Sequence, residues 1–330
     1  MRGSILHLGL ALVVLTARAS GQGQAPGQVP LPHAKPVPRV QAIPQPYDQV
    51  SIQLNGQERT RYHFGPGLRR PFLFPVVGPS GRSLSRMGHP HDPVTHSHHN
   101  SVWISHNDVG GISFWDDRGA GRIVHRRVLR LDDGDDAAAV AVENSWVGKN
   151  DRVLLVERRR MTVRPLDGEG RDWLLVIDLD LSAPASSTTL GKTPFGLVGV
   201  RMAKTIGVHD GGGLIRNSEG KAGEKGENGV FWKPARWVDY SGPIALDANE
   251  GMTLFDHPGN PNHPSIFHVR EDGWMGASLT FHGPRTIDPG KPLRLRYGLY
   301  VHAGVPTAEA IDARWKGFAA LPVERIPEKP

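Results

Sequence analysis

The chain has no cysteine among its 330 residues. This absence excludes disulfide bonds, thiolate metal sites and a thiol nucleophile, so the fold must be stabilised by the size of its core. With 38% hydrophobic and 22% charged residues, the composition is that of a globular protein. The length suffices for one large domain or two smaller ones.

Long hydrophobic runs are also lacking. The longest one, at residues 5–15, is too short and too interrupted to form a membrane-spanning helix. Because Arg2 precedes this run and small residues follow it, residues 1–19 match a secretory signal peptide with cleavage after Ala19. We therefore expect an exported protein, periplasmic or extracellular, without a membrane span.

Neither a strong charge nor a nucleotide-binding motif is present. The net charge is only +6, and the basic residues are spread along probable strands instead of clustering with aromatic residues. This distribution argues against nucleic-acid binding. The chain has no phosphate-binding glycine loop, no G-x-S-x-G elbow and no dinucleotide fingerprint.

A segment rich in proline, glutamine and glycine follows the signal peptide. Residues 20–46 have too few large apolar side chains to form a core, so they are predicted to be a flexible linker. The folded part is expected to begin near Tyr47, and Asn55-Gly56 marks an opening β-hairpin. No break in composition follows, so residues 47–330 are predicted to form a single β-sandwich domain.

Short segments with alternating apolar and polar residues recur along this domain. Ile177, Leu179 and Leu181 alternate with Asp178 and Asp180, which is the pattern of a half-buried antiparallel strand. About fourteen such segments are expected, separated by glycine, proline, asparagine and aspartate. They predict an all-β fold, a large antiparallel two-sheet β-sandwich.

Three local features depart from the run of long strands. One short C-terminal helix is expected at residues 308–316, where Thr307 can cap it and Gly317 can close it. A short strand is expected at residues 112–115. The interruption at residues 207–240 is expected to be a long loop that folds over the functional site.

The histidines are concentrated between Arg86 and Trp115. Six of the sixteen lie there: His89, His91, His96, His98, His99 and His106. Because imidazole can transfer protons near neutral pH, His98 or His99 is predicted to act as a general base, with His91, His106 and Asp108 contacting substrate. No cofactor is expected, and a divalent metal held by His96 and His98 is an alternative. A purely structural role for these loop histidines is another.

Two further segments carry acids and histidines. Glu219 is predicted to be a catalytic acid or partner, and Asp239 is predicted to contact substrate. Asp256 and His257, directly after a strand, could form a second acid–base pair, with His268 as a substrate contact. The alternative for Glu219 and Asp239 is that both are ordinary loop acids exposed to solvent. The alternative for Asp256 and His257 is a proline-rich turn capped by Asp256.

Three residues of probable strands complete the predicted site. Arg201 lies in an apolar segment, where an unpaired guanidinium is costly to bury, so it is predicted to bind substrate or to pair with an acid. Trp103 and Trp237 are predicted to stack on sugar rings. The alternative for both is packing in the core.

Several motifs together resemble one bacterial family. They are RPFLFPV at residues 70–76, HSHHNSVWISHNDVGGISFW at 96–115, TPFGL at 193–197, NSEG at 217–220, RWVDYSG at 236–242 and FDHPGNP at 255–261. This set resembles the family labelled methane oxygenase PmoA. The resemblance implies a β-supersandwich similar to galactose mutarotases and a role in carbohydrate metabolism. Methane oxidation itself is rejected, because the chain has no spanning segment beyond the signal peptide.

The sequence thus predicts an exported carbohydrate-active protein. The leading hypothesis is an enzyme that performs histidine and carboxylate acid–base chemistry on a sugar or glycoside, as a lyase, hydrolase or epimerase. The alternatives are a non-catalytic glycan-binding protein and a protein with a histidine-bound copper or zinc ion. The expected partner is a sugar or glycan, and the sequence predicts no oligomeric state.

Overall fold

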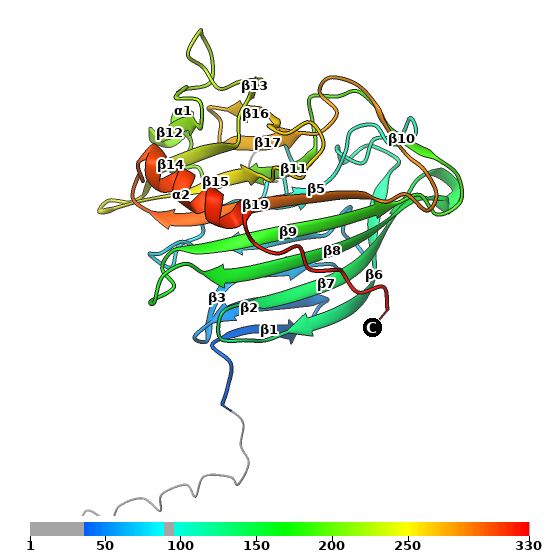
Figure 1. The fold of residues 1–330 in the computed structure, drawn as a ribbon, viewed down its shortest axis with the longest axis horizontal. Helices are drawn as coiled ribbons and strands as arrows, with labels where there is room; N and C mark the ends of the chain where they lie inside the picture. The colour runs from blue at the N-terminus through cyan, green and yellow to red at the C-terminus, as the bar shows by residue number, and fades with distance from the viewer. Residues whose placement is uncertain (1–35, 89–95, 330) are drawn as a thin grey trace, which may run out of the picture. The chain divides into compact units, whose positions relative to one another are not determined.

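Two large antiparallel sheets make up most of the structure, a computed structural model that describes residues 36–88 and 96–329 (Figure 1). The first sheet has nine strands. In spatial order they are β1 (Val40–Gln45), β2 (Gln49–Leu54), β3 (Gln57–His63), β4 (Phe72–Val76), β5 (Val102–Ile104), β11 (Leu197–Arg201), β17 (Trp274–Ser278), β16 (Ile266–Arg270) and β13 (Lys233–Pro234).

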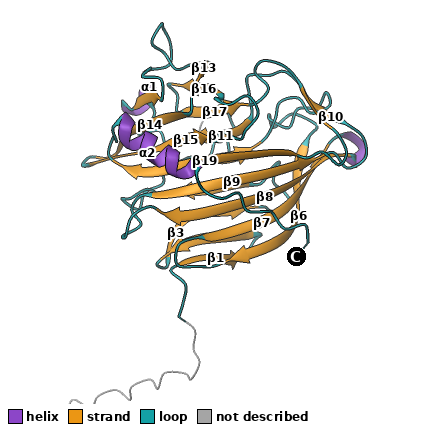
Figure 2. Ribbon diagram, viewed as in Figure 1, coloured by secondary structure: helices purple, strands orange, loops and turns teal. Residues whose placement is uncertain are grey.

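The second sheet has eight strands. In spatial order they are β12 (Leu214–Asn217), β14 (Trp237–Ala245), β15 (Ala248–Asp256), β19 (Leu293–Ala303), β9 (Trp173–Ser182), β8 (Val153–Pro165), β7 (Ala138–Val147) and β6 (Arg122–Asp132). The remaining elements are the pair β10 (Thr188–Leu190) and β18 (Arg285–Ile287), the 3-10 turn η1 (Lys149–Asp151), and the helices α1 (Val208–Gly211) and α2 (Ala308–Ala319). Strands dominate the fold, as Figure 2 shows.

The main hydrophobic core lies between the two sheets. On β9, Ile177, Leu179 and Leu181 face this core, and Asp178 on the opposite face forms an ion pair with Arg296. The period of two follows from the pleat of a strand, which sends successive side chains to opposite faces. The predicted two-sheet antiparallel β-sandwich with a C-terminal helix is therefore confirmed.

Helix α2 covers part of the outer face of the eight-stranded sheet (Figure 1). Ile311 and Phe318 of the helix pack on Trp237, Phe255 and Tyr300 of the strands. Thr307 accepts a hydrogen bond from the backbone N–H of Ala310, as an N-cap does. The predicted closure at Gly317 is wrong, because the helix continues to Ala319.

The folded part begins earlier than predicted. Strand β1 (Val40–Gln45) lies inside the segment 20–46 that was predicted to be a linker, because Val40 and Ala42 bury their side chains in the core. Pro44 is compatible with this strand because β1 is at the edge of its sheet, where one side of the backbone needs no ladder hydrogen bonds. The described residues from Pro38 onward form one compact unit.

Two local predictions were also wrong. Residues 112–115 form no strand, and only Ile112 makes an isolated bridge, to Val109. Residues 207–240 are not one long loop, because they contain α1, β12, β13 and the start of β14. No helix in the described part of the chain is long and apolar enough to cross a membrane.

Candidate functional site

The outer face of the nine-stranded sheet carries a second cluster of aromatic side chains, on the side away from the core. Trp103 on β5 lies between Val102 and Ile104, which face the core, so its indole points outward. By the same alternation Trp274 on β17 and His268 on β16 project from the outer face. These side chains form the floor of the candidate site.

Two glycines make room for the indole rings on this face. Gly199 of β11 is paired in register with Trp103 on one side and with Gly276 of β17 on the other. A Cβ atom at Gly199 would lie 2.5 Å from Cζ2 of Trp103, and one at Gly276 would lie 3.1 Å from Cζ2 of Trp274. The indoles can therefore pack close to the backbone, which larger residues at these positions would prevent.

Buried Arg70 holds two loops over this floor. Its guanidinium donates to the carbonyl of His98 at 3.0 Å and to Oδ1 of Asn100 at 2.6 Å, in the histidine-rich loop. It also donates to the carbonyls of Phe114 at 3.0 Å and Trp115 at 2.7 Å, in the neighbouring loop. One charged side chain thus supplies hydrogen bonds to both loops, which do not belong to a sheet.

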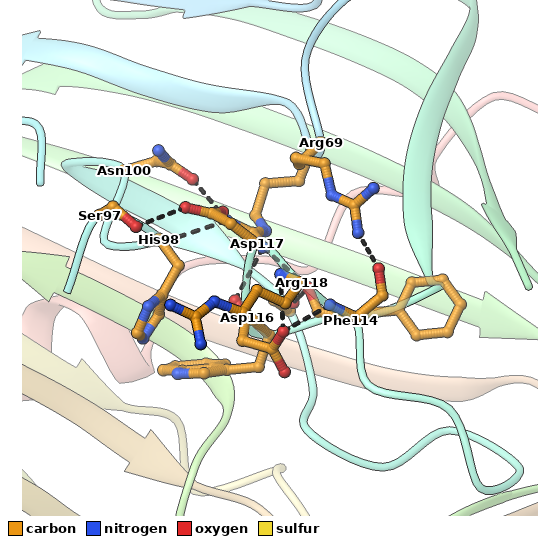
Figure 3. A network of polar contacts seen from close by, with 12 residues as sticks. Arg69, Ser97, His98, Asn100, Phe114, Asp116, Asp117 and Arg118 are labelled. Carbon is orange, nitrogen blue, oxygen red and sulfur yellow. Dashed lines mark hydrogen bonds and ion pairs between the residues drawn. The ribbon is translucent and has the colours of Figure 1, made fainter. Parts of the chain in front are cut away.

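Asp117 joins the same two loops, and Asp116 orders the second of them (Figure 3). Ser97 donates to Oδ2 of Asp117 at 2.8 Å, and Arg70 lies 3.6 Å from the other oxygen of this carboxylate. Asp116 accepts hydrogen bonds from Ser113 and from the backbone N–H of Arg118. The position of the histidine-rich loop is therefore fixed by charge-assisted contacts.

A pocket of about 240 Å³ lies between the loops and the floor. It is lined by His96, His98, His99, Trp115, Phe195, His268, Arg270 and Trp274. This volume is below the roughly 300–1,000 Å³ that is typical of pockets for drug-sized ligands. The pocket therefore fits a small ligand or one end of a longer one.

His99 is at the centre of the cluster and is only 4% exposed. Its ring stacks on Trp103 at 5.0 Å and on Trp274 at 5.5 Å, measured between ring centroids. Nδ1 of His99 and the indole nitrogens of both tryptophans are buried, and they make no hydrogen bond in the part of the chain that the structure describes. Buried polar atoms are normally paired, so three unpaired ring nitrogens in one cluster are unusual; of the three residues, His99 and Trp274 line the pocket.

Three of the pocket histidines, His98, His99 and His268, are held in their neutral form. Burial, followed by the charge of Arg70, lowers the pKa of His98 to about 4. Burial likewise lowers the pKa of His268 to about 4, and it holds the pKa of His99 well below the ordinary value of 6.5. At neutral pH these imidazoles can each donate one hydrogen bond and accept another, but they carry no charge.

One carboxylate lies beside the pocket. Asp272, in the turn between β16 and β17, is 3.1 Å from the guanidinium of Arg201 and 3.9 Å from Nδ1 of His96. The guanidinium of Arg270 is 3.8 Å from its second oxygen. The Asp272 carboxylate is thus shared by two arginines and lies near His96, beyond hydrogen-bond distance.

The histidine rings do not converge as metal ligands do. His96 and His99 stack with centroids 4.5 Å apart, and the rings of His96 and His98 are 5.9 Å apart. Among the described residues, no group of three or more histidine, aspartate or glutamate side chains could hold a metal ion. The metal-binding alternative for His96 and His98 thus finds no third ligand there.

A model of one protein family matches most of the chain. It is the family of unknown function DUF6807, and the match covers residues 49–316. The chain belongs to this family. A search of curated proteins gave no match.

Solved structures resemble this DUF6807 protein only distantly. A protein described as an aldose 1-epimerase from Escherichia coli K12 is 11% identical with a TM-score of 0.35, over 74% of this chain and 97% of that one. A protein described as a kojibiose phosphorylase from the human microbiome is 8% identical with a TM-score of 0.35, over 87% of this chain and 37% of that one. A TPR-domain protein from Parabacteroides distasonis is 10% identical with a TM-score of 0.36, over 87% and 51%. Such scores carry no argument about function.

Two residues predicted to contact substrate lie elsewhere in the DUF6807 chain. Trp237 is 1% exposed beneath α2 and donates its indole N–H to Asp312 at 2.7 Å. Asp239 is buried and pairs with Arg216 at 2.6 Å and with His302 at 3.0 Å. Neither side chain lies at the pocket, because Trp237 is covered by and bonded to α2, and Asp239 is enclosed and paired in the eight-stranded sheet.

The predicted acid–base partners are not brought to the pocket either. The Asp256 carboxylate accepts hydrogen bonds from Asn260, His263 and the backbone N–H of Ser265, so it fixes the proline-rich turn after β15. His257 lines a separate cavity of about 570 Å³, against β9, β19 and the C-terminal residues. Glu219 is exposed in the loop after β12, where Ser218 and Arg236 contact it.

The remaining predicted residues divide into two groups. The structure brings together His96, His98, His99, Trp103, Arg201 and His268 at or beside the pocket. Trp103 stacks against His99 and is 0% exposed, so its ring packs in the aromatic cluster and does not line the pocket. His106 contacts Thr280 and the carbonyl of Asp108, and the Asp108 carboxylate caps Gly111, so neither lines the pocket. His91 lies outside the described residues.

Sequence reasoning missed five residues of the site. Trp115, Phe195, Arg270 and Trp274 line the pocket, and Asp272 pairs with two of its neighbours. The Asp-Gly dipeptide at residues 272–273 is an ordinary hairpin signal, which hid the second role of Asp272. For Trp274, the outward position could have been read from alternation with Met275 and Ala277.

Proposed function

We propose that this protein binds a carbohydrate ring in the pocket between the histidine-rich loop and the outer face of the nine-stranded sheet. The observation that carries the proposal is the combination, in one pocket, of flat aromatic walls with the neutral imidazoles of His98 and His268. A sugar ring has an apolar C–H face that packs on aromatic rings, and its hydroxyl groups both donate and accept hydrogen bonds. The resemblance to the family labelled PmoA supports the same class of ligand.

A second candidate function is acid–base conversion of the bound sugar. It is favoured by the proximity of Asp272 to His96, which lines the pocket. In this hypothesis His96 acts as the general base, and His98 and His99 bind the substrate as neutral imidazoles. The pKa of His98 near 4 makes that side chain a weak base at neutral pH, so binding is its expected role.

A glycan panel tests both functions. The purified protein is incubated with plant and algal glycans, and binding is measured by calorimetry while new products are sought by chromatography. His98→Ala should weaken binding of the active glycan by about tenfold or more, as expected when a pocket hydrogen bond and ring contact are lost. The fold should persist, since His98 lies in a loop.

His209→Ala is the matched control, because this histidine is exposed on α1 and is not among the pocket residues. It should bind as the unmodified protein does. Equal binding by the His98 and His209 variants would contradict the assignment of the pocket. Products in addition to binding would establish the enzyme, and binding without products would leave a glycan-binding protein.

A further inference from the structure

An exposed aromatic platform adjoins the pocket. Trp232, directly before β13, is 44% exposed, whereas the other tryptophans are buried or partly buried. Its ring stacks on Phe231 with centroids 4.5 Å apart and meets the edge of Phe281 at 5.7 Å. A flat indole presented to solvent is suited to stacking on a second ring.

His268 joins this platform to the pocket. On one side its ring contacts Phe195 at 5.1 Å and Trp274 at 4.1 Å, both of which line the pocket. On the other side it meets Phe231 at 4.8 Å and Trp232 at 6.0 Å. The platform and the pocket are therefore adjacent, and the ring of His268 lies between them.

The backbone of Trp232 is strained, although its exposed side chain gains little free energy from burial. Its φ angle is 56°, in the left-handed region that costs free energy for residues other than glycine. A hydrogen bond from its backbone N–H to the carbonyl of Phe267, 2.9 Å long, fixes it to β16. Strain of this kind concentrates at functional sites, and here the hydrogen bond to β16 maintains it.

We infer that the ligand is an oligosaccharide, with one sugar ring in the pocket and the next ring stacked on Trp232. This inference rests on the proposed function. The pocket, at about 240 Å³, accommodates only part of such a ligand, so the following ring must lie outside it. The platform at Trp232 is the exposed aromatic surface that adjoins the pocket across His268.

Titration calorimetry tests the inference with monosaccharides and their homotrisaccharides. The probes are glucose, galactose, mannose, xylose and glucuronic acid, each compared with its trisaccharide. The unmodified protein should bind the preferred trisaccharide about tenfold tighter than the monosaccharide, the effect of one added stacking contact of about 1.4 kcal/mol. Trp232→Gly should reduce trisaccharide affinity to the level of the monosaccharide and leave monosaccharide affinity unchanged.

Glycine is the informative replacement because it tolerates the left-handed backbone. The thermal midpoint of Trp232→Gly should therefore be unchanged or higher. Tyr47→Gly is the matched control: Tyr47 is also aromatic, 89% exposed and left-handed with a φ of 62°, but it lies in the β1–β2 turn. This variant should keep full affinity for the trisaccharide.

The possible failures are distinguishable. If the monosaccharide binds and the trisaccharide binds no tighter, or if Trp232→Gly retains the trisaccharide preference, the platform has no binding role and this inference is overturned alone. If no sugar of either length binds, the proposed function fails as well.

Discussion

Replacement of His99 by phenylalanine separates a binding role from a structural one. His99 is enclosed by Trp103, Trp274 and His96, and its ring stacks on all three. Its Nδ1 atom is buried and makes no hydrogen bond within the described residues. Phenylalanine preserves the flat ring and the stacking but removes both ring nitrogens.

The expected effect on stability is a gain. A buried polar atom without a partner costs about 1–3 kcal/mol, and removing it recovers that free energy. The slightly larger phenyl ring offsets part of the gain through tighter packing. We therefore expect the free energy of unfolding to rise by about 1 kcal/mol, while the affinity for the sugar falls by about fivefold or more through the lost hydrogen bond.

Urea denaturation at pH 7, followed by tryptophan fluorescence, measures the stability, and calorimetry measures the binding. His106→Phe is the matched control, because both ring nitrogens of His106 are bonded, at 2.8 Å to the carbonyl of Asp108 and at 2.9 Å to Oγ1 of Thr280. This variant should lose about 2 kcal/mol of stability and keep its affinity. An equal loss of stability in the two variants, or full sugar binding by His99→Phe, would refute the reasoning.

Two further predictions concern pH and the turn after β15. Burial is the main cause that lowers the folded-state pKa of His98 and of His268 to about 4, from 6.5, so between these values the unfolded chain binds more protons than the folded one. Their contribution to stability is thus fully present above pH 6.5 and lost as the pH falls to 4. The urea midpoint of the unmodified protein should therefore drop over this range. It should drop less steeply in His268→Asn, and as steeply as in the unmodified protein in His209→Asn. Asp256→Ala should lower the free energy of unfolding by about 2–4 kcal/mol, since three donors lose their acceptor, yet bind sugar normally. If Asp256→Ala lost sugar binding while its urea midpoint stayed unchanged, this result would instead support the predicted catalytic role of Asp256.

The strands were predictable because their signal is local. Alternation at Ile177, Leu179 and Leu181 directly reports which side chains face the core. Strand β1 was not predictable in the same way, because the proline-rich composition of residues 20–46 outweighs the two buried side chains Val40 and Ala42. Its place at a sheet edge, which makes Pro44 acceptable, is a property of the assembled sheet.

The site was most readily predictable where its residues are close in sequence. His96, His98 and His99 lie in one loop, so their density was a valid signal. Asp256 and His268 are separated by only a short turn, yet they end in different sheets, on β15 and β16. Which sheet a strand joins depends on long-range pairing, and the sequence near these two residues does not contain that information.

The register of the nine-stranded sheet explains why imidazoles can be neutral at a surface of the protein. The outer face of an antiparallel sheet is usually solvated, so a histidine there would keep an ordinary pKa. Here Trp103, Gly199, Gly276 and His268 occupy one row across four neighbouring strands, and the small glycines let the indoles cover the face. His99 rests on this aromatic layer, out of water. A shift of one residue in β11 would place Val198 or Val200 in the row and expel the indoles, so the chemistry of the pocket depends on strand register.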